Sequence, residues 1–272
     1  MCIRDRDIRK KDVVLNKGTF LNPAELGLIA SLGFSKIKVF KKIKVGFFST
    51  GDEIVKAGEE IKSGQVYDSN HFTIHSMLKK LNVECIDLGV IPDNKIIIKN
   101  TLLNAAKQAD VIVTSGGVSV GQADYMKEVL KDIGQVLFWK LSIKPGRPIA
   151  FGKIKKSNFF GLPGNPVSAM VTFYQIVQNA IKICMGLKND GPIPLLKVEC
   201  VESIFKKPGR TEFQRGVLFQ SNGLWKVKTS GQQGSGILSS MSKANCLIVL
   251  DIDQKSIKVD DYVNIQLMEG LV

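Results

Sequence analysis

The chain has 272 residues, of which 44% are hydrophobic and 23% charged, and its formal net charge is +13. These values are typical of a globular protein with one or two domains. No apolar run approaches the roughly 20 residues of a membrane helix, and the charged N-terminus lacks the apolar core of a signal peptide. A cytoplasmic protein without membrane contact is therefore expected.

The strongly basic charge leaves nucleic acid or an anionic small molecule as partner. The lysines are spread along the chain in pairs, without interleaved aromatic residues or a basic arm. This distribution favours a solvated surface over a nucleic-acid-binding face. The five cysteines are far apart and include no CxxC pair, which argues against a disulfide framework or a thiolate metal site.

Residues 1–42 are too few to hold a core of their own. Short strands are predicted at Asp12–Gly18 and Ile37–Phe40. Between them, Asn22 is a good helix cap because a proline follows it at the first helical position. Gly33 is predicted to end that helix.

From residue 43 to residue 187, short apolar strands alternate with helical patterns. The predicted strands are 44–49, 83–88, 110–114, 136–141 and 158–160. Helices are predicted to begin near Asn70, Asp93, Tyr125 and Asn165. This alternation predicts a three-layer α/β domain with a mostly parallel sheet. In such sheets, ligands bind beyond the carboxyl ends of the strands.

Residues 188–272 form a second predicted domain of a different class. A linker at Gly191–Pro194 is followed by strands rather than helices. The predicted strands are 196–201, 213–219, 225–229, 245–251 and 262–267. Their spacing and turn residues predict a small all-β barrel or sandwich.

The segment Ser115–Gly121 is the strongest candidate for a binding loop. It holds three glycines and two serines directly after a buried strand, so its backbone can turn sharply and approach a ligand closely. The helix that begins near Tyr125 would direct its N-terminal N–H groups at an anion. An ordinary tight turn between a strand and a helix stays open as the alternative.

Charged residues gather in the other predicted strand-end loops. Glu53, Asp93 and Asp124 lie in three separate loops and would together suit Mg²⁺ and a phosphate. Each of these acids could instead be a helix cap. One further loop carries the basic residues Lys140, Lys144 and Arg147. Such a cluster suits a phosphate or another oxyanion.

Two other chemistries are disfavoured. His71 and His75 have a spacing that can bind zinc, but the glutamate of an HExxH motif and a third ligand are missing. The sequence also contains neither GxGxxG after a strand nor GxxxxGK[ST], which argues against a dinucleotide-binding protein and against a P-loop NTPase.

Five motifs in order carry a resemblance to a known family. They are STGDE (49–53), YDSN (67–70), TSGGVSVGQADY (114–125), FWKLSIKPGRP (138–148) and GLPGNPVSA (161–169). Together they resemble the molybdopterin molybdenumtransferases, which comprise the MoeA proteins and the gephyrin E domain. PGRTEFQRG (208–216) and residues 231–250 resemble the C-terminal β domain of that family.

The resemblance implies a MogA-like α/β domain, a C-terminal β-barrel and the last step of molybdenum cofactor synthesis. In that step molybdenum from molybdate enters adenylylated molybdopterin, with Mg²⁺-dependent release of AMP. Glu53, Asp93 and Asp124 match acidic catalytic positions that would hold Mg²⁺, and Lys140 and Lys144 match basic catalytic positions. The implied substrate contacts are Thr50, Gly51, Asp52, Ser69, Asn70, Ser115, Gly116, Gly117, Val118, Ser119, Arg147, Pro163, Gly164, Asn165 and Pro166.

The chain departs from the family pattern at two motif positions and in its N-terminal part. Gln122 stands where an acid is expected, and Arg147 stands where a lysine is expected. Residues 1–42 would be the remnant of two N-terminal domains, and residues 1–6 match no family pattern, as a cloning or assembly scar would. In the family a homodimer partner completes the cleft.

Two other functions stay open beside the molybdenum-inserting transferase. One is a non-catalytic pterin-binding or scaffold module, and the other is a MogA-like molybdopterin adenylyltransferase. The sequence also leaves open whether molybdate or tungstate is used.

Overall fold

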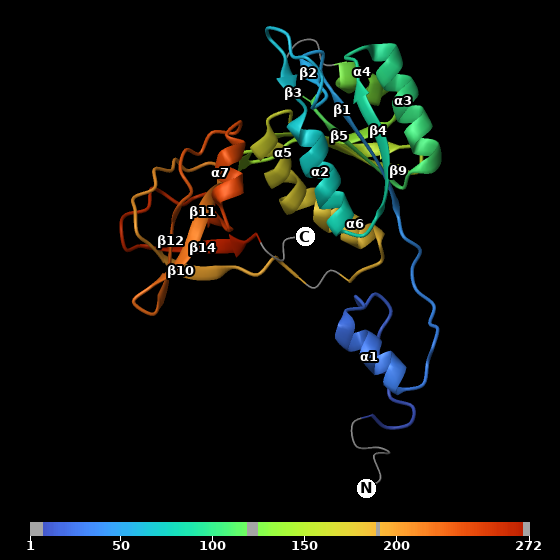
Figure 1. Cartoon of the computed structure of the whole chain (residues 1–272), viewed down its shortest axis with the longest axis vertical. Coiled ribbons are helices and arrows are strands. Elements are labelled where there is room, and N and C mark those ends of the chain that lie inside the picture. The colour runs from blue at the N-terminus through green and yellow to red at the C-terminus, as the bar shows by residue number, and fades with distance from the viewer. Residues whose placement is uncertain (1–7, 119–124, 189–190, 269–272) are drawn as a thin grey trace.

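The computed structural model describes residues 8–118, 125–188 and 191–268. Figure 1 shows an α/β body, a β-barrel beside it and an N-terminal segment that projects from the α/β body. The segment contacts that body at residues 186–188, where the N–H of Lys188 donates to the carbonyl of Gly18 at 3.3 Å. That segment contains helix α1 (Pro23–Ser31), whose predicted cap is confirmed: the Asn22 side chain accepts hydrogen bonds from the backbone N–H groups of Ala24 and Glu25. Gly33 follows the helix with a positive φ of 83°.

The prediction of strands at Asp12–Gly18 and Ile37–Phe40 is wrong. Neither stretch forms a regular strand. A strand needs a neighbouring strand edge to bond its N–H and C=O groups. Figure 1 shows that the N-terminal segment lies away from the edges of both sheets.

The α/β body is built on a six-stranded sheet with the order β4-β1-β5-β9-β8-β6. The strands are β4 (Glu84–Ile91), β1 (Lys44–Thr50), β5 (Val111–Ser115), β9 (Ser157–Leu162), β8 (Pro148–Ile154) and β6 (Gln135–Lys140). β8 runs antiparallel to both of its neighbours. The other strands therefore all run in one direction, and their carboxyl ends share one edge with the amino end of β8. We call this the carboxyl edge.

Helices cover both faces of this sheet, which confirms the three-layer prediction (Figure 1). One face carries α3 (Lys95–Gln108) and α4 (Tyr125–Ile133), and the other carries α2 (Ser69–Lys80) and the continuous helix α5 (Pro166–Thr172), η1 (Phe173–Val177) and α6 (Gln178–Cys184). Phe47 packs with the second group and Phe48 with the first, and both are fully buried. Strands buried on both faces read as continuous apolar runs, as β1 does.

The second body is a closed five-stranded barrel, because β12 pairs with both β10 and β11. Its strands are β10 (Leu196–Cys200), β11 (Thr211–Ser221), β12 (Leu224–Thr229), β13 (Cys246–Leu250) and β14 (Tyr262–Leu267). All five were predicted, and the barrel alternative is confirmed. Three further short elements accompany these bodies: β2 (Ile54–Val55) pairs with β3 (Val66–Tyr67), and α7 (Leu238–Lys243) lies on the barrel.

One short strand joins the two bodies. β7 (Ile143–Lys144) follows the last residues of β6 but pairs with β11 of the barrel. Neither β7 nor α7 was predicted from the sequence, and β8 was also missed. The loop between β6 and β8 therefore belongs to the sheet at its ends and to the barrel at its middle.

Candidate active site at the carboxyl edge

The strand order brings the sequence motifs to the carboxyl edge in a defined row. Asp93 follows β4, Glu53 follows β1, Gly116 follows β5, the proline loop 163–166 follows β9, and Lys140 ends β6. The acids therefore stand at one end of the row and the cations at the other, with the two loops between. Neighbouring strands lie about 4.8 Å apart, so the five steps from β4 to β6 span about 24 Å. Two of the predicted site residues, Ser119 and Asp124, lie outside the described residues.

Three carboxylates crowd the acidic end of the row. The backbone N–H of Asp93 donates to Oδ1 of Asp52 at 3.0 Å. The Glu53 carboxylate folds over Gly51, where a Cβ atom would lie 2.8 Å from each of its oxygens. Burial, and then the charges of Asp52 and Glu53, raise the pKa of Asp93 above its usual range.

The alternative role of Asp93 as a helix cap is wrong. The side chain of the next residue, Asn94, caps α3 by accepting from the N–H groups of Ile96 and Ile97 at 3.0 and 3.2 Å. The Asp93 carboxylate is therefore not occupied by the helix.

The donor set at this end fits a hard divalent cation. Asp52, Glu53 and Asp93 form no ion pair with any described residue, and carboxylate oxygens are the ligands that Mg²⁺ prefers. Within the described ranges, no three acidic, histidine or cysteine side chains already converge as a metal centre. A cation would therefore be recruited with help from an anionic ligand or from parts of the chain outside those ranges.

The start of the glycine loop can be made only by glycine. Gly116 has a φ of +87°, and a Cβ atom there would lie 2.2 Å from the carbonyl oxygen of Thr50. Gly117 has a φ of +67°, and its Cβ atom would lie 2.9 Å from Cγ2 of Thr50. The N–H of Gly116 donates to the carbonyl of Leu162 at 3.1 Å. The loop is therefore pressed against the ends of β1 and β9. Val118 is buried and packs against Gly161, so it anchors the loop from the core side.

Asn70, the second residue of α2, connects the two central loops. Its Nδ2 group donates to Oγ of Ser115 and to the carbonyl of Gly164, both at 2.7 Å. Its Oδ1 atom is buried with no hydrogen-bond partner among the described residues, and the same holds for the hydroxyl of Ser49 near the end of β1. Unpaired buried polar atoms are rare in folded proteins, and their concentration at this edge is typical of a site completed by water or a ligand. Ser69, beside Asn70, lines a hollow of about 380 Å³.

The proline loop lies between the glycine loop and the barrel. Gly164 and Asn165 are exposed, and Pro166 begins α5. Asn165 occupies the predicted cap position, but its side chain makes no capping hydrogen bond. Instead, the N–H of Val167 donates to the carbonyl of Ser235 in the barrel at 3.1 Å. The barrel thus takes part in shaping this part of the carboxyl edge.

The basic loop presents its cations at the far end of the row. Lys140 and Arg147 are exposed, and the N–H of Leu141 donates to the carbonyl of Arg147 at 3.0 Å, which closes the loop. Lys144 lies in β7, and its Nζ atom contacts both carboxylate oxygens of Glu212 at 3.2 and 3.3 Å. Sequence reasoning did not single out Glu212; its only signal was its place in the PGRTEFQRG motif.

The two histidines of α2 do not share a site. Nε2 of His71 lies 3.1 Å from Oδ2 of Asp87, whereas Nδ1 of His75 lies 3.7 Å from Sγ of Cys85. The rings stack with centroids 6.2 Å apart.

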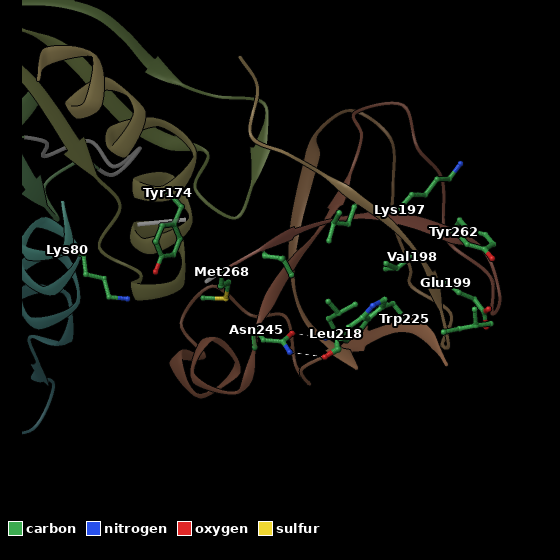
Figure 2. A pocket seen from close by; sticks show the side chains of 14 residues that line it. Lys80, Tyr174, Lys197, Val198, Glu199, Leu218, Trp225, Asn245, Tyr262 and Met268 are labelled. Carbon is green, nitrogen blue, oxygen red and sulfur yellow. Dashed lines mark hydrogen bonds between the residues drawn. The ribbon is translucent and has the colours of Figure 1, made fainter. Parts of the chain in front are cut away.

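A larger hollow lies elsewhere, between the α/β body and the barrel. It has a volume of about 960 Å³. Figure 2 shows Lys80 and Tyr174 on its α/β side and Trp225 and Tyr262 on its barrel side. None of the site residues predicted from the sequence lines it. The open carboxyl edge, which carries the motifs that follow five strands, is therefore the candidate site, and this hollow is not.

Comparison with known proteins accounts for the same two bodies. Residues 46–183 match the family described as "Probable molybdopterin binding domain", and residues 197–268 match the family described as "MoeA C-terminal region (domain IV)". The chain belongs to the MoeA family. In this MoeA-family chain, the glycine loop and the basic loop fall within the first match and Glu212 falls within the second.

Named relatives agree with this placement. The molybdopterin molybdenumtransferase of Haemophilus influenzae is 46% identical over 261 residues, which cover 96% of this chain and 65% of that protein. Gephyrin of Dictyostelium discoideum is 35% identical over 280 residues, covering 90% of this chain and 39% of gephyrin. The crystal structure of the molybdopterin biosynthesis MoeA protein of Pyrococcus horikoshii has a TM-score of 0.77 at 32% identity, with 96% of this chain and 63% of that one covered. The chain thus spans less than two thirds of the length of these relatives.

Among the described residues, no helix combines the length and apolar character needed to cross a bilayer.

Proposed function

We propose that the chain binds adenylylated molybdopterin along the carboxyl edge and transfers molybdenum from molybdate into the pterin, with release of AMP. One observation carries the proposal: the strand order aligns acids, glycine loop, proline loop and cations in a single row of about 24 Å. A row of that length suits an elongated anionic ligand rather than a single phosphate. The name of the Haemophilus influenzae relative supports the same reaction.

The residues in the row would have different roles: contact with a phosphate, binding of an oxyanion and positioning of the loops. The N–H group of Gly117 can lie close to a phosphate, because neither Gly116 nor Gly117 has a side chain in the way. Lys140 and Arg147 supply exposed cations, which suit a phosphate or molybdate oxyanion. Asn70 holds the glycine and proline loops at a fixed separation.

Glu53 and Asp93 would hold Mg²⁺, together with Asp124 outside the described residues. The bound ion would neutralise phosphate charge and polarise the bond that releases AMP. The chain's own contribution there is a cluster of carboxylates: burial, and then the charges of Asp52 and Glu53, raise the pKa of Asp93, and a cation would relieve the repulsion.

The test is AMP release from adenylylated molybdopterin with molybdate and Mg²⁺. Glu53→Gln and Lys140→Ala should each reduce the rate by about 100-fold, which is the typical loss when one charge-stabilising group is removed. Glu59→Gln and Lys156→Ala are matched controls. Glu59 is exposed beyond β2, and Lys156 lies in the β8–β9 turn at the opposite edge. If the two site variants released AMP at the parent rate, the assignment would be wrong.

A second candidate is a pterin-binding module without catalysis. The observation that favours it is the family description that matches residues 46–183, which names a binding domain and no reaction. This candidate predicts stoichiometric binding of adenylylated molybdopterin with no AMP release. A MogA-like adenylyltransferase would instead consume ATP and form the adenylylated pterin. A cytoplasmic location and pairing as a homodimer stay predictions.

A further inference from the structure

We propose that Glu212 of the barrel is a positioning residue for Lys144, so that the barrel sets the geometry of the anion-binding end of the site. This inference rests on the proposed function, because it concerns a lysine assigned to that site. The lysine and the glutamate are 68 residues apart in the chain and belong to different bodies of the fold.

The main chain fixes the pair before any side chain contributes. β7 pairs with β11 in parallel, and the register places Lys144 opposite Glu212 and Ile143 opposite Thr211. The N–H of Thr211 also donates to the carbonyl of Ser142 at 3.0 Å. Residues opposite each other on neighbouring strands project to the same face, so the backbone itself brings the two side chains together.

The side-chain contact is asymmetric. The Glu212 side chain is only 6% exposed, whereas that of Lys144 is 49% exposed. Nε2 of Gln214 donates to Oε2 of Glu212 at 3.0 Å and holds the carboxylate from a second side. The carboxylate is therefore the fixed partner, and the lysine tip is the group being held. An ammonium has three donors, and two carboxylate oxygens leave one donor for a ligand.

The charges predict what the pair does. Glu212 balances the charge of Lys144, so the net positive charge of this loop comes from Lys140 and Arg147, neither of which forms an ion pair with the described residues. Removing the glutamate charge would make the loop more attractive to an oxyanion but would release the lysine tip. Binding and turnover should therefore change in opposite directions.

The test compares Glu212→Gln with the matched variant Glu199→Gln. Glu199 holds Lys226 within the barrel, with Nζ 2.5 Å from Oε1, away from the carboxyl edge. Proton–nitrogen NMR of side-chain ammonium groups detects lysines whose protons are held in hydrogen bonds. We expect Glu212→Gln to lose the Lys144 signal and keep that of Lys226, and Glu199→Gln to do the reverse.

Kinetics supply the readout that a merely structural role would not give. In Glu212→Gln we expect kcat for AMP release to fall by about tenfold, while KM for molybdate falls or stays constant, because the anion then meets one negative charge fewer. Glu199→Gln should keep both constants. If Glu212→Gln fails to fold, Glu212→Asp, which keeps the charge on a shorter side chain, should show a smaller loss of kcat with KM unchanged.

Two results would overturn the inference. One is a Lys144 ammonium signal that persists in the Glu212 variant, and the other is an unchanged kcat in a folded Glu212 variant. Failure of the proposed function looks different, because the parent chain would then release no AMP while the NMR comparison would still report whether Glu212 holds Lys144.

Discussion

Replacing Gly116 by alanine should displace the glycine loop from the end of β1. The added methyl group would lie 2.2 Å from the carbonyl oxygen of Thr50, which is backbone in a fully buried strand. Ordinary van der Waals contact needs about 3.4 Å, so the loop or the strand must move by roughly 1.2 Å. The φ of +87° adds strain, because only glycine adopts that region without a steric penalty.

The size of the effect follows from these two terms. The left-handed backbone costs an alanine about 1–2 kcal/mol, and the forced displacement of packed backbone adds about 1–3 kcal/mol, as overpacking does in other cores. A combined loss of about 3 kcal/mol lowers the thermal midpoint of a domain of this size by about 6–12 °C. A shift of about 1 Å in a substrate-positioning loop should also reduce turnover by about 100-fold.

Thermal unfolding and AMP release should be measured on Gly116→Ala and on the matched variant Gly164→Ala. Gly164 lies in the neighbouring proline loop, and a methyl group there would find its nearest atom, Cα of Gly116, at 3.9 Å. Gly164→Ala should therefore keep the parent midpoint. Equal midpoints for the two variants would refute the steric reasoning.

Three further predictions concern single side chains. Burial, and then the charges of Asp52 and Glu53, raise the pKa of Asp93, so the folded state loses stability as pH rises through the carboxyl range near pH 4. Asp93→Asn should therefore raise the melting temperature at pH 7 but not at pH 3, and an equal gain at both would contradict the argument that the ionised form is disfavoured. Asn70→Ala removes two hydrogen bonds of 2.7 Å and should cost about 2 kcal/mol in chemical denaturation, whereas no loss would mean that the loops are held by other contacts. Burial raises the pKa of the Cys246 thiol to about 12. A thiol reagent at pH 8 should therefore label the exposed Cys184 in the native protein and Cys246 only on unfolding. Labelling of both cysteines at equal rates would contradict the burial of Cys246.

The local patterns that the sequence predicted well are those with short-range causes. The Asn22 cap depends on neighbours two and three residues away, and the barrel strands combine inward-facing apolar residues with turn residues between them. The gathering of the motif loops at the carboxyl edge was predictable because parallel strands place their following loops together. That prediction needs only the direction of the strands and no knowledge of which distant loops contact one another.

The features that were missed depend on long-range pairing or on tertiary context. Pro148–Ile154 forms β8, an antiparallel strand inserted between β9 and β6, and this insertion breaks the strand–helix alternation used for prediction. β7 is a strand only because β11 lies beside it. At the start of α3, two residues with capping side chains stand together, and the sequence could not decide that Asn94 rather than Asp93 takes the cap. The apolar residues of the N-terminal segment suggested strands, but no strand edge lies beside them.

The most direct measurement of the central claim is a crystal structure of this chain with adenylylated molybdopterin. The account predicts ligand density along the carboxyl edge, with a phosphate beside Gly116 and Gly117 and with the ligand running between the acidic end at Glu53 and the basic end at Lys140. A ligand ordered instead in the hollow beside Tyr174 and Trp225, with the carboxyl edge untouched, would contradict it.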